Sequence, residues 1–253
     1  MTARAWRYVT FDATGTLLRP AEPTGATYVR FWEAASGQRF SSSRREAAAA
    51  ALTRHFPAEF SLQQRLAPNF GWDGVSASAF PWWRRLVLSV MTRADVAEGL
   101  QHREQAERFT RDLYAHYARP EAWTVFADVR SALEQLQAQQ VPLGVISNFD
   151  ERLEPVLVAL QLRDAFRVVT TSFSQPQMKP HAAIFESTFR QLQGEEEDED
   201  VQTQRFLHVG DHPSRDYRAA RAVGAHAKLL MRRGAPPSDV LAGDVIASLM
   251  DVQ

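Results

Sequence analysis

The sequence YVTFDATGTLL occupies residues 8–18. Its first four residues form a short, mostly apolar run of the kind found in buried parallel strands. The run ends at a carboxylate, Asp12, and Gly15 follows where a sharp turn and a close approach of the backbone are expected. In open parallel sheets, ligands bind at the carboxyl ends of the strands. We therefore expect this strand to end at a binding site.

Four further apolar runs follow along the chain. They lie at residues 143–146, 166–169, 206–209 and 227–230, and helix-length segments separate them. Strands that alternate with helices are typical of α/β proteins. The pattern predicts an α/β fold whose core is a doubly wound, mostly parallel, Rossmann-like sheet.

The alternation is interrupted once, between the first strand and the second. About 130 residues separate these strands, far more than a crossover connection requires. The interval contains helical patterns punctuated by prolines and glycines. We predict a core formed by residues 1–21 and 109–253, with a helical domain at 22–108 inserted after the first strand. The aromatic residues of this insertion either form its own core or contribute to a substrate pocket.

The composition excludes several function classes. The 253-residue chain contains no cysteine, which excludes disulfides, thiol nucleophiles and thiolate metal sites. Its net charge is −1 and its basic residues are spread out, so nucleic acid is not expected as the main partner. No apolar stretch approaches the length of a membrane span, so we expect a cytoplasmic protein without a membrane partner. Six consecutive acidic residues at 195–200 predict a solvated, mobile loop, and the oligomeric state leaves no signature in the sequence.

Polar side chains follow the predicted strands. Asp12 follows the first strand, Ser147 the second and Gly210-Asp211 the fourth, while Lys179 precedes the helix after the third. Because the carboxyl ends of parallel strands meet at one edge of a sheet, we expect these groups to converge. They suit phosphoryl transfer, with Asp12 as a carboxylate nucleophile and with Ser147 and Lys179 holding phosphoryl oxygens. A phosphate beside carboxylates requires a divalent cation, and oxygen ligands such as Asp211 favour Mg²⁺.

Four short motifs occur in order along the chain. They are Asp-x-x-Gly-Thr at 12–16, Ser-Asn at 147–148, Lys-Pro at 179–180 and Gly-Asp-x-x-x-x-Asp at 210–216. Together, each near the end of a predicted strand, they resemble the motifs of the haloacid dehalogenase superfamily of hydrolases. The resemblance implies that the inserted helical domain is a cap. The sequence around the first two motifs resembles that of one subgroup of the superfamily in particular.

The resemblance also implies a role for each matched residue. Asp12 is the nucleophile and ligates Mg²⁺, together with the backbone carbonyl of Thr14 and the carboxylate of Asp211. Asp216 is a second-layer or water-mediated partner of the metal. The substrate is a small phosphorylated molecule. Its phosphoryl group is bound by Thr16, Ser147, Asn148 and Lys179.

One position departs from the family pattern. Phosphatases of the superfamily usually carry a second Asp two residues after the nucleophile, where this chain has Thr14. A threonine hydroxyl does not exchange protons near neutral pH, and the loss of a general acid or base typically removes ~10²–10⁴ in rate. Either another group supplies the proton, or the leaving group needs none, or the aspartyl phosphate is long-lived. His212, directly after Asp211, is one candidate for a substitute acid.

Two other functions remain open. A 2-haloacid dehalogenase also lacks the second Asp, but it needs no metal, which leaves Asp211 and Asp216 unexplained. A binding or scaffold protein on a degraded hydrolase core explains Thr14, but not the retention of carboxylates and an ammonium in one cleft. Two further polar residues have structural interpretations: His208 as a core residue, and Asp150 as the N-cap of a helix at 151–160.

Overall fold

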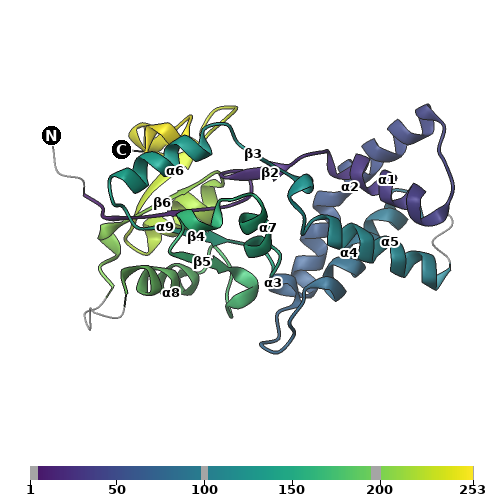
Figure 1. The fold of residues 1–253 in the computed structure, drawn as a ribbon, viewed down its shortest axis with the longest axis horizontal. Coiled ribbons are helices and arrows are strands. Elements are labelled where there is room, and N and C mark those ends of the chain that lie inside the picture. The colour runs from purple at the N-terminus through teal and green to yellow at the C-terminus, as the bar shows by residue number, and fades with distance from the viewer. Residues whose placement is uncertain (1–4, 98–101, 195–200, 253) are drawn as a thin grey trace. The chain divides into compact units, whose positions relative to one another are not determined.

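The computed structural model describes residues 5–97, 102–194 and 201–252 (Figure 1). The acidic run at 195–200, predicted to be a loop, lies outside these ranges. The chain divides into two compact units, each described by itself. One consists of Met1–Arg19 with Val125–Gln253, and the other of Pro20–Thr124. None of the helices in the described ranges is long and apolar enough to cross a membrane.

The first unit contains the predicted parallel sheet. All five predicted strands are present, and a sixth, missed because it is only two residues long, lies at the sheet edge. Neighbouring strands pair in parallel throughout. The predicted α/β class is confirmed. The strands are β1 (Tyr8–Phe11), β4 (Leu143–Ser147), β5 (Val168–Thr171), β6 (Phe206–Gly210), β7 (His226–Leu230) and β8 (Val245–Ile246).

The strand order places three carboxyl ends side by side. The order is β5-β4-β1-β6-β7-β8, so the chain builds one half of the sheet outward from β1 and then returns to build the other half. Phe11, the last residue of β1, pairs with Val145 on one side and with Val209 on the other. This reversal of strand order is the place where open α/β sheets bind ligands, and Asp12 follows directly.

Helices cover both faces of this sheet. Figure 1 shows α6 on one side of the strands and α8 on the other. The apolar face of α8, with Phe185 and Phe189, packs into a buried cluster that also contains Ile146 and Phe206 from the strands. The helices of this unit are α6 (Val129–Ala138), α7 (Leu153–Ala159), a π-helix (Pro213–Arg218), α8 (Ala182–Gln193) and α9 (Ala219–Ala222), with short 3₁₀ turns at 163–165, 172–174, 203–205, 242–244 and 249–251.

The second unit is helical, and the chain enters it through β2 (Leu18–Pro20) and leaves it through β3 (Trp123–Val125), which pair with each other. The predicted end of the insertion at 108 falls inside α5, whose buried face continues to Leu113. Its helices are α1 (Thr24–Ser36), α2 (Ser42–Leu66), α4 (Phe80–Arg93) and α5 (Arg103–His116), with a 3₁₀ turn at 120–122 and a short segment labelled α3 (Pro68–Gly71).

The aromatic residues of the helical unit pack mainly against one another. Phe70 and Trp82 are buried, with ring centroids 5.2 Å apart. Phe60 lies edge-on to Trp82 at 5.4 Å. The segment that carries Phe70 is a left-handed turn rather than an α-helix, because Asn69 and Phe70 have φ values of 51° and 56°. Of the two interpretations left open by the sequence, a core of aromatic side chains describes Phe70 and Trp82. Trp72, Phe80 and Trp83 are only partly buried, and their part in a substrate pocket stays a prediction.

Candidate active site

The strand ends bring most of the predicted site residues together. Asp12 follows β1, Ser147 ends β4, and Asp211 follows β6, so the three come from adjacent strands. Lys179 lies in the connection between β5 and α8. Its side chain is buried and reaches back across the sheet edge to Asp12, 167 residues earlier in the chain. The sheet topology therefore converts four distant motifs into one cluster.

Asp12 lies at the centre of the cluster. Its Oδ1 accepts a hydrogen bond from Lys179 Nζ at 2.8 Å and one from Ser147 Oγ at 3.4 Å. Thr16 Oγ1 donates to the other oxygen, Oδ2, at 3.5 Å. All four side chains are buried. A buried carboxylate in contact with an ammonium and two hydroxyls is held in one orientation at the edge of the sheet.

Two more carboxylates lie beside Asp12. One oxygen from each of Asp12, Asp211 and Asp216 falls within 4.8 Å of the others. Two glycines make this approach feasible. A Cβ at Gly15, where φ is +98°, would overlap the carboxylate of Asp211, and a Cβ at Gly210 would overlap that of Asp216. A side chain at either glycine would therefore displace the neighbouring carboxylate from this position.

Both oxygens of the Asp216 carboxylate have hydrogen-bond partners. Its Oδ1 accepts from Lys179 Nζ at 2.6 Å and contacts His208 Nε2 at 3.3 Å. Its Oδ2 accepts from the backbone N–H of His212 at 2.9 Å. Behind it, His208 Nδ1 lies 2.9 Å from Thr10 Oγ1. These partners fix a neutral His208 tautomer that donates through Nε2 to Asp216 and accepts from Thr10 through Nδ1.

The site carries more negative than positive charge. Burial raises the pKa of Asp12, and the neighbouring Lys179 ammonium opposes that rise. Burial also acts to raise the pKa of Asp216, but Lys179 and the hydrogen bond from His208 outweigh it, so this pKa is lowered. Burial acts to lower the pKa of Lys179, but both carboxylates raise it, and the ammonium is retained. Burial lowers the pKa of His208, in agreement with its neutral tautomer.

Asp211 is the exposed member of the cluster. Partial burial of the carboxyl, together with the charges on Asp12 and Asp216, raises its pKa to about 7. Three carboxylates against one ammonium leave an excess of negative charge that a divalent cation would neutralise. The donors are all hard oxygens, which suit Mg²⁺. The residues therefore fit a magnesium ion.

Thr14 and His212 lie next to the cluster in sequence. Thr14 is exposed, two residues after Asp12, and forms an isolated bridge with Leu18. His212 acts as the N-cap of the π-helix, because its Nδ1 accepts from the backbone N–H groups of Ser214 and Arg215 at 3.1 and 3.2 Å. This arrangement leaves Nε2 as its protonated nitrogen when the ring is neutral. The role of His212 as a substitute acid stays a prediction.

Two residues have contacts that differ from those expected. The Asn148 side-chain amide bonds to the main chain of Lys179 on both of its polar atoms, each at 2.8 Å. Asp150 is not the N-cap of a helix that begins at 151, because α7 begins at Leu153 and Arg152 occupies its N-cap position with no side-chain capping bond. Asp150 forms a buried, two-pronged ion pair with Arg152 instead, at 2.8 and 2.6 Å. Its Oδ1 also accepts from the backbone N–H of Arg152 at 3.1 Å, so this short carboxylate binds both the main chain and the guanidinium of one residue.

Thr10 was not singled out in the sequence, although a signal for it exists. Thr10 and His208 are directly paired across β1 and β6. Both residues are buried and polar. Thr10 lies two positions before Asp12, and His208 lies two positions before Gly210. Two polar residues at the same offset in otherwise apolar runs indicate a hydrogen-bonded pair inside the sheet.

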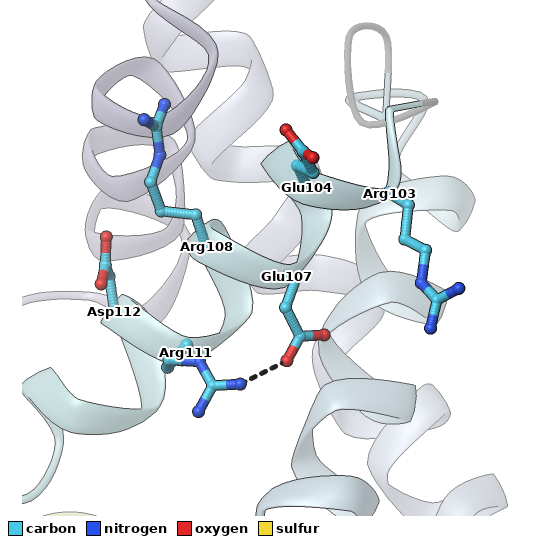
Figure 2. Close-up of a pocket in the computed structure, with 6 residues that line it drawn as sticks. All are labelled: Arg103, Glu104, Glu107, Arg108, Arg111 and Asp112. Carbon is cyan, nitrogen blue, oxygen red and sulfur yellow. Dashed lines mark hydrogen bonds and ion pairs between the residues drawn. The ribbon is translucent and has the colours of Figure 1, made fainter.

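A separate open hollow lies along α5 in the helical unit (Figure 2). Glu107 accepts from Arg111 at 2.7 Å and from Arg84 at 3.0 Å, and Arg108 donates to the carbonyl of Ala35. The charges of Glu107, Arg111 and Arg84 are therefore paired within the unit. None of the residues predicted for the site lines the hollow, whose side chains are Arg103, Glu104, Glu107, Arg108, Arg111 and Asp112.

Comparison with known families identifies the chain. A family model described as haloacid dehalogenase-like hydrolase matches residues 6–224. The chain belongs to this family. The subgroup resemblance in the first two motifs is also confirmed, since the chain is 30% identical over 240 residues to haloacid dehalogenase-like hydrolase domain-containing protein 3 of Bos taurus. That match covers 95% of this chain and 87% of the bovine protein.

Solved structures of the haloacid dehalogenase-like fold include enzymes of two kinds. A HAD phosphatase from Thermococcus onnurineus is similar with a TM-score of 0.59 and 21% identity, covering 97% of this chain and 95% of that one. A 2-haloacid dehalogenase from Pseudomonas syringae pv. Tomato DC3000 has a TM-score of 0.63 and 24% identity, covering 98% and 96%. The fold is thus common to both activities, and the site must distinguish them.

Proposed function

We propose that this hydrolase is a Mg²⁺-dependent phosphatase that acts on a small phosphorylated metabolite through an aspartyl phosphate on Asp12. One observation carries the proposal. Asp12 is bonded to the Lys179 ammonium at 2.8 Å, while oxygens of Asp211 and Asp216 lie within 4.8 Å of its own. A nucleophile, a cation for the phosphoryl oxygens and a set of metal ligands are thereby combined.

In the proposed reaction, a carboxylate oxygen of Asp12 attacks phosphorus. The bond from phosphorus to the leaving oxygen breaks as the acyl phosphate forms, and water then attacks phosphorus to release inorganic phosphate and the carboxylate. Lys179, Ser147 and Thr16 stabilise the charge on the transferring oxygens, since all three already point at Asp12. The buried ammonium is the strongest of these contributions.

Asp12, Asp211 and the backbone carbonyl of Thr14 would hold the Mg²⁺. Both oxygens of Asp216 already accept hydrogen bonds, one of them from Lys179, so we assign Asp216 an indirect or water-mediated role. The metal would neutralise charge on the phosphate and the carboxylates, as divalent cations do in phosphoryl transfer. Without such a cation, an anionic substrate meets the negative excess of the site.

Thr14 makes the hydrolytic step slow in this proposal. Its hydroxyl cannot act as the acid that protonates the leaving group or as the base that activates water at neutral pH. Substrates with good leaving groups, such as aryl or acyl phosphates, are therefore favoured. For the same reason the aspartyl phosphate should accumulate during turnover.

A 2-haloacid dehalogenase is the second candidate, and Thr14 is the observation that favours it. In that reaction Asp12 attacks carbon and displaces halide without a metal. The argument against it is Asp211, whose pKa of about 7 reflects partial burial of the carboxyl and the charges of two other carboxylates. A reaction without a metal gives no reason to maintain that repulsion.

The test measures three quantities on the same protein preparation. These are phosphate release from p-nitrophenyl phosphate with Mg²⁺ or with EDTA, halide release from 2-chloropropionate, and the intact mass of the protein during turnover. We expect Mg²⁺-dependent phosphate release and a covalent phosphoryl adduct, both abolished by Asp12→Asn. Metal-independent halide release would replace this proposal with the dehalogenase. Failure of both reactions, or phosphatase activity that survives Asp12→Asn, would reject the proposed mechanism.

A further inference from the structure

The Asn148 side chain and the Lys179 main chain form a closed pair of hydrogen bonds. Asn148 Nδ2 donates to the Lys179 carbonyl, and the Lys179 N–H donates to Asn148 Oδ1, each at 2.8 Å. A backbone N–H can only donate and a carbonyl can only accept, so this pairing fixes the orientation of the amide. It joins the end of β4 to a connection 31 residues later.

This pair of hydrogen bonds satisfies the main-chain N–H and C=O of Lys179, a residue that lies in no strand or helix. Lys179 lies between the 3₁₀ turn at 172–174 and α8, outside regular secondary structure. Main-chain groups in such a connection need partners, and here one side chain provides both. Asn148 directly follows Ser147, the last residue of β4, which pairs with β1. The two hydrogen bonds therefore fix the Lys179 backbone relative to β4 and to β1, the strand that Asp12 follows.

Lys179 is consequently held at both ends. Its ammonium contacts Asp12 and Asp216 at 2.8 and 2.6 Å, and its backbone contacts Asn148. A lysine side chain has four rotatable bonds, and their freedom is removed when both ends are fixed. The ammonium then needs no reorganisation when charge develops on a phosphoryl group.

The same contacts argue against Asn148 as the main phosphate ligand. Its Oδ1 is an acceptor and repels phosphate oxygens, and one of its two amide hydrogens is already committed to the Lys179 carbonyl. Ser147 and Lys179 hold Asp12 directly, whereas the Asn148 amide points at the backbone of Lys179.

We propose that Asn148 is a positioning residue, which acts on the reaction by fixing the main chain of Lys179 and so the direction of its ammonium. The catalytic part of this inference rests on the proposed function, because it assigns Lys179 to the transferring phosphoryl group. The structural part, the hold of Asn148 on Lys179, is independent of any activity. Exchange of the Lys179 amide tests the structural part, and phosphate binding tests the catalytic part.

The composition of the chain makes the experiment direct. Lysine occurs only at positions 179 and 228, so protein labelled with ¹⁵N-lysine has two backbone amide signals. Lys228 lies in β7, paired with Val209 of β6, and serves as an internal control. A Lys228→Arg variant assigns the signals by removing one of them.

Exchange of the Lys179 amide with solvent tests the hold itself. In Asn148→Ala the Lys179 amide loses its acceptor, and we expect exchange to accelerate about tenfold or more, with Lys228 unchanged. Asn148→Asp keeps an acceptor oxygen and loses the donor, so protection of the Lys179 amide should be largely retained. Unchanged Lys179 exchange in Asn148→Ala would overturn the proposal. Equal acceleration at both lysines would also overturn it, because it would indicate general loosening of the fold.

Binding of inorganic phosphate in the presence of Mg²⁺ tests how Asn148 acts. We expect Asn148→Ala to weaken phosphate binding about tenfold when Lys179 is present and by less than about twofold in a Lys179→Met background, because the effect passes through the ammonium. An equal loss in both backgrounds would show direct contact between Asn148 and phosphate and would overturn the positioning role. If the unmodified protein binds no phosphate, the proposed function fails, whereas the exchange measurement still decides whether Asn148 holds Lys179.

Discussion

The Nζ of Lys179 lies 2.8 Å from Oδ1 of Asp12, and both side chains are buried. The ammonium also bonds to Asp216, so its removal would leave two carboxylates close together without a counter-charge. We expect Lys179→Met to reduce turnover of an aryl phosphate by ~10²-fold or more and to lower the free energy of unfolding by about 3–5 kcal/mol at neutral pH. Urea unfolding and steady-state kinetics measure the two effects.

Lys228→Met is the matched control for that substitution. Lys228 pairs with Asp244 at 3.5 Å in a more exposed setting, and such pairs contribute about 1 kcal/mol or less. The stability loss in Lys179→Met should also shrink as the pH is lowered, because protonation of Asp12 relieves the repulsion. A loss that is independent of pH, or equal in the two variants, would contradict the assigned role of the ammonium.

We expect Asp211 to make binding of the proposed Mg²⁺ dependent on pH. Its pKa is raised to about 7 by partial burial and by the charges of Asp12 and Asp216, so the metal-free site holds a proton at lower pH. Mg²⁺ binds the deprotonated carboxylate and must displace that proton. We expect the Mg²⁺ affinity to fall about tenfold for each unit of pH below 7 and to level off above pH 8. Titration calorimetry at several pH values measures the affinity and the released proton.

Asp211→Asn is the control for the pH dependence. It removes the titrating group and one proposed ligand, so binding should be weaker and nearly constant between pH 6 and 8. An unmodified protein with the same affinity at pH 6 and pH 8 would refute the assignment of Asp211 as a ligand. The direction of the Asp211 pKa shift can also be tested without metal. Ionisation of a carboxyl with a raised pKa lowers the free energy of unfolding as the pH increases from about 4 to 7.

The sequence was sufficient for the parts of the site that depend on strand ends. Asp12 and Ser147 follow from hydrophobic runs of strand length, and parallel pairing then requires their proximity. The edge strand β8 could not be predicted, because two residues contain no periodicity. The 108/109 boundary proposed for the insertion falls within α5, since no break in composition marks the place where the chain leaves a helical unit.

Contacts between loops were not predictable from the sequence. Whether Asn148 faces a phosphate or the backbone of Lys179 depends on the path of a connection 31 residues away. The pKa of Asp211 likewise depends on distances to Asp12 and Asp216 that no spacing specifies. Motifs predict which residues are close together, whereas hydrogen-bond direction and charge coupling require coordinates.

Gly15 is expected to be essential for the geometry of the proposed metal site. A Cβ at this position would overlap the Asp211 carboxylate, and the φ of +98° is unfavourable for any other residue. We expect Gly15→Ala to weaken Mg²⁺ binding at least about tenfold by displacing Asp211, in addition to a stability loss of about 1 kcal/mol or more from backbone strain. Calorimetric titration and thermal unfolding separate these effects.

Gly37 provides a control that isolates the strain. It has a φ of +73°, but a Cβ there would meet no atom within 4 Å. Gly37→Ala should therefore lower stability by about 1 kcal/mol and leave Mg²⁺ binding unchanged. If Gly15→Ala binds Mg²⁺ as well as the unmodified protein does, Asp211 is either not a ligand or free to move aside.

Thr14→Asp tests whether the missing acid limits the rate. Thr14 is exposed two residues after Asp12, so a carboxylate there can be accommodated without desolvation. We expect kcat to rise by up to about 10²-fold, and the rise should be larger for an alkyl phosphate than for p-nitrophenyl phosphate, because only the alkoxide needs a proton on departure. The phosphoryl adduct expected by intact mass should diminish at the same time, since the carboxylate can also activate water.

Thr14→Asn is the control for Thr14→Asp. It has similar size and no exchangeable acid, so it should reproduce neither change. An equal gain for both substrates would instead indicate an effect of charge on metal or substrate binding, and no gain in Thr14→Asp would mean that another group already supplies the proton.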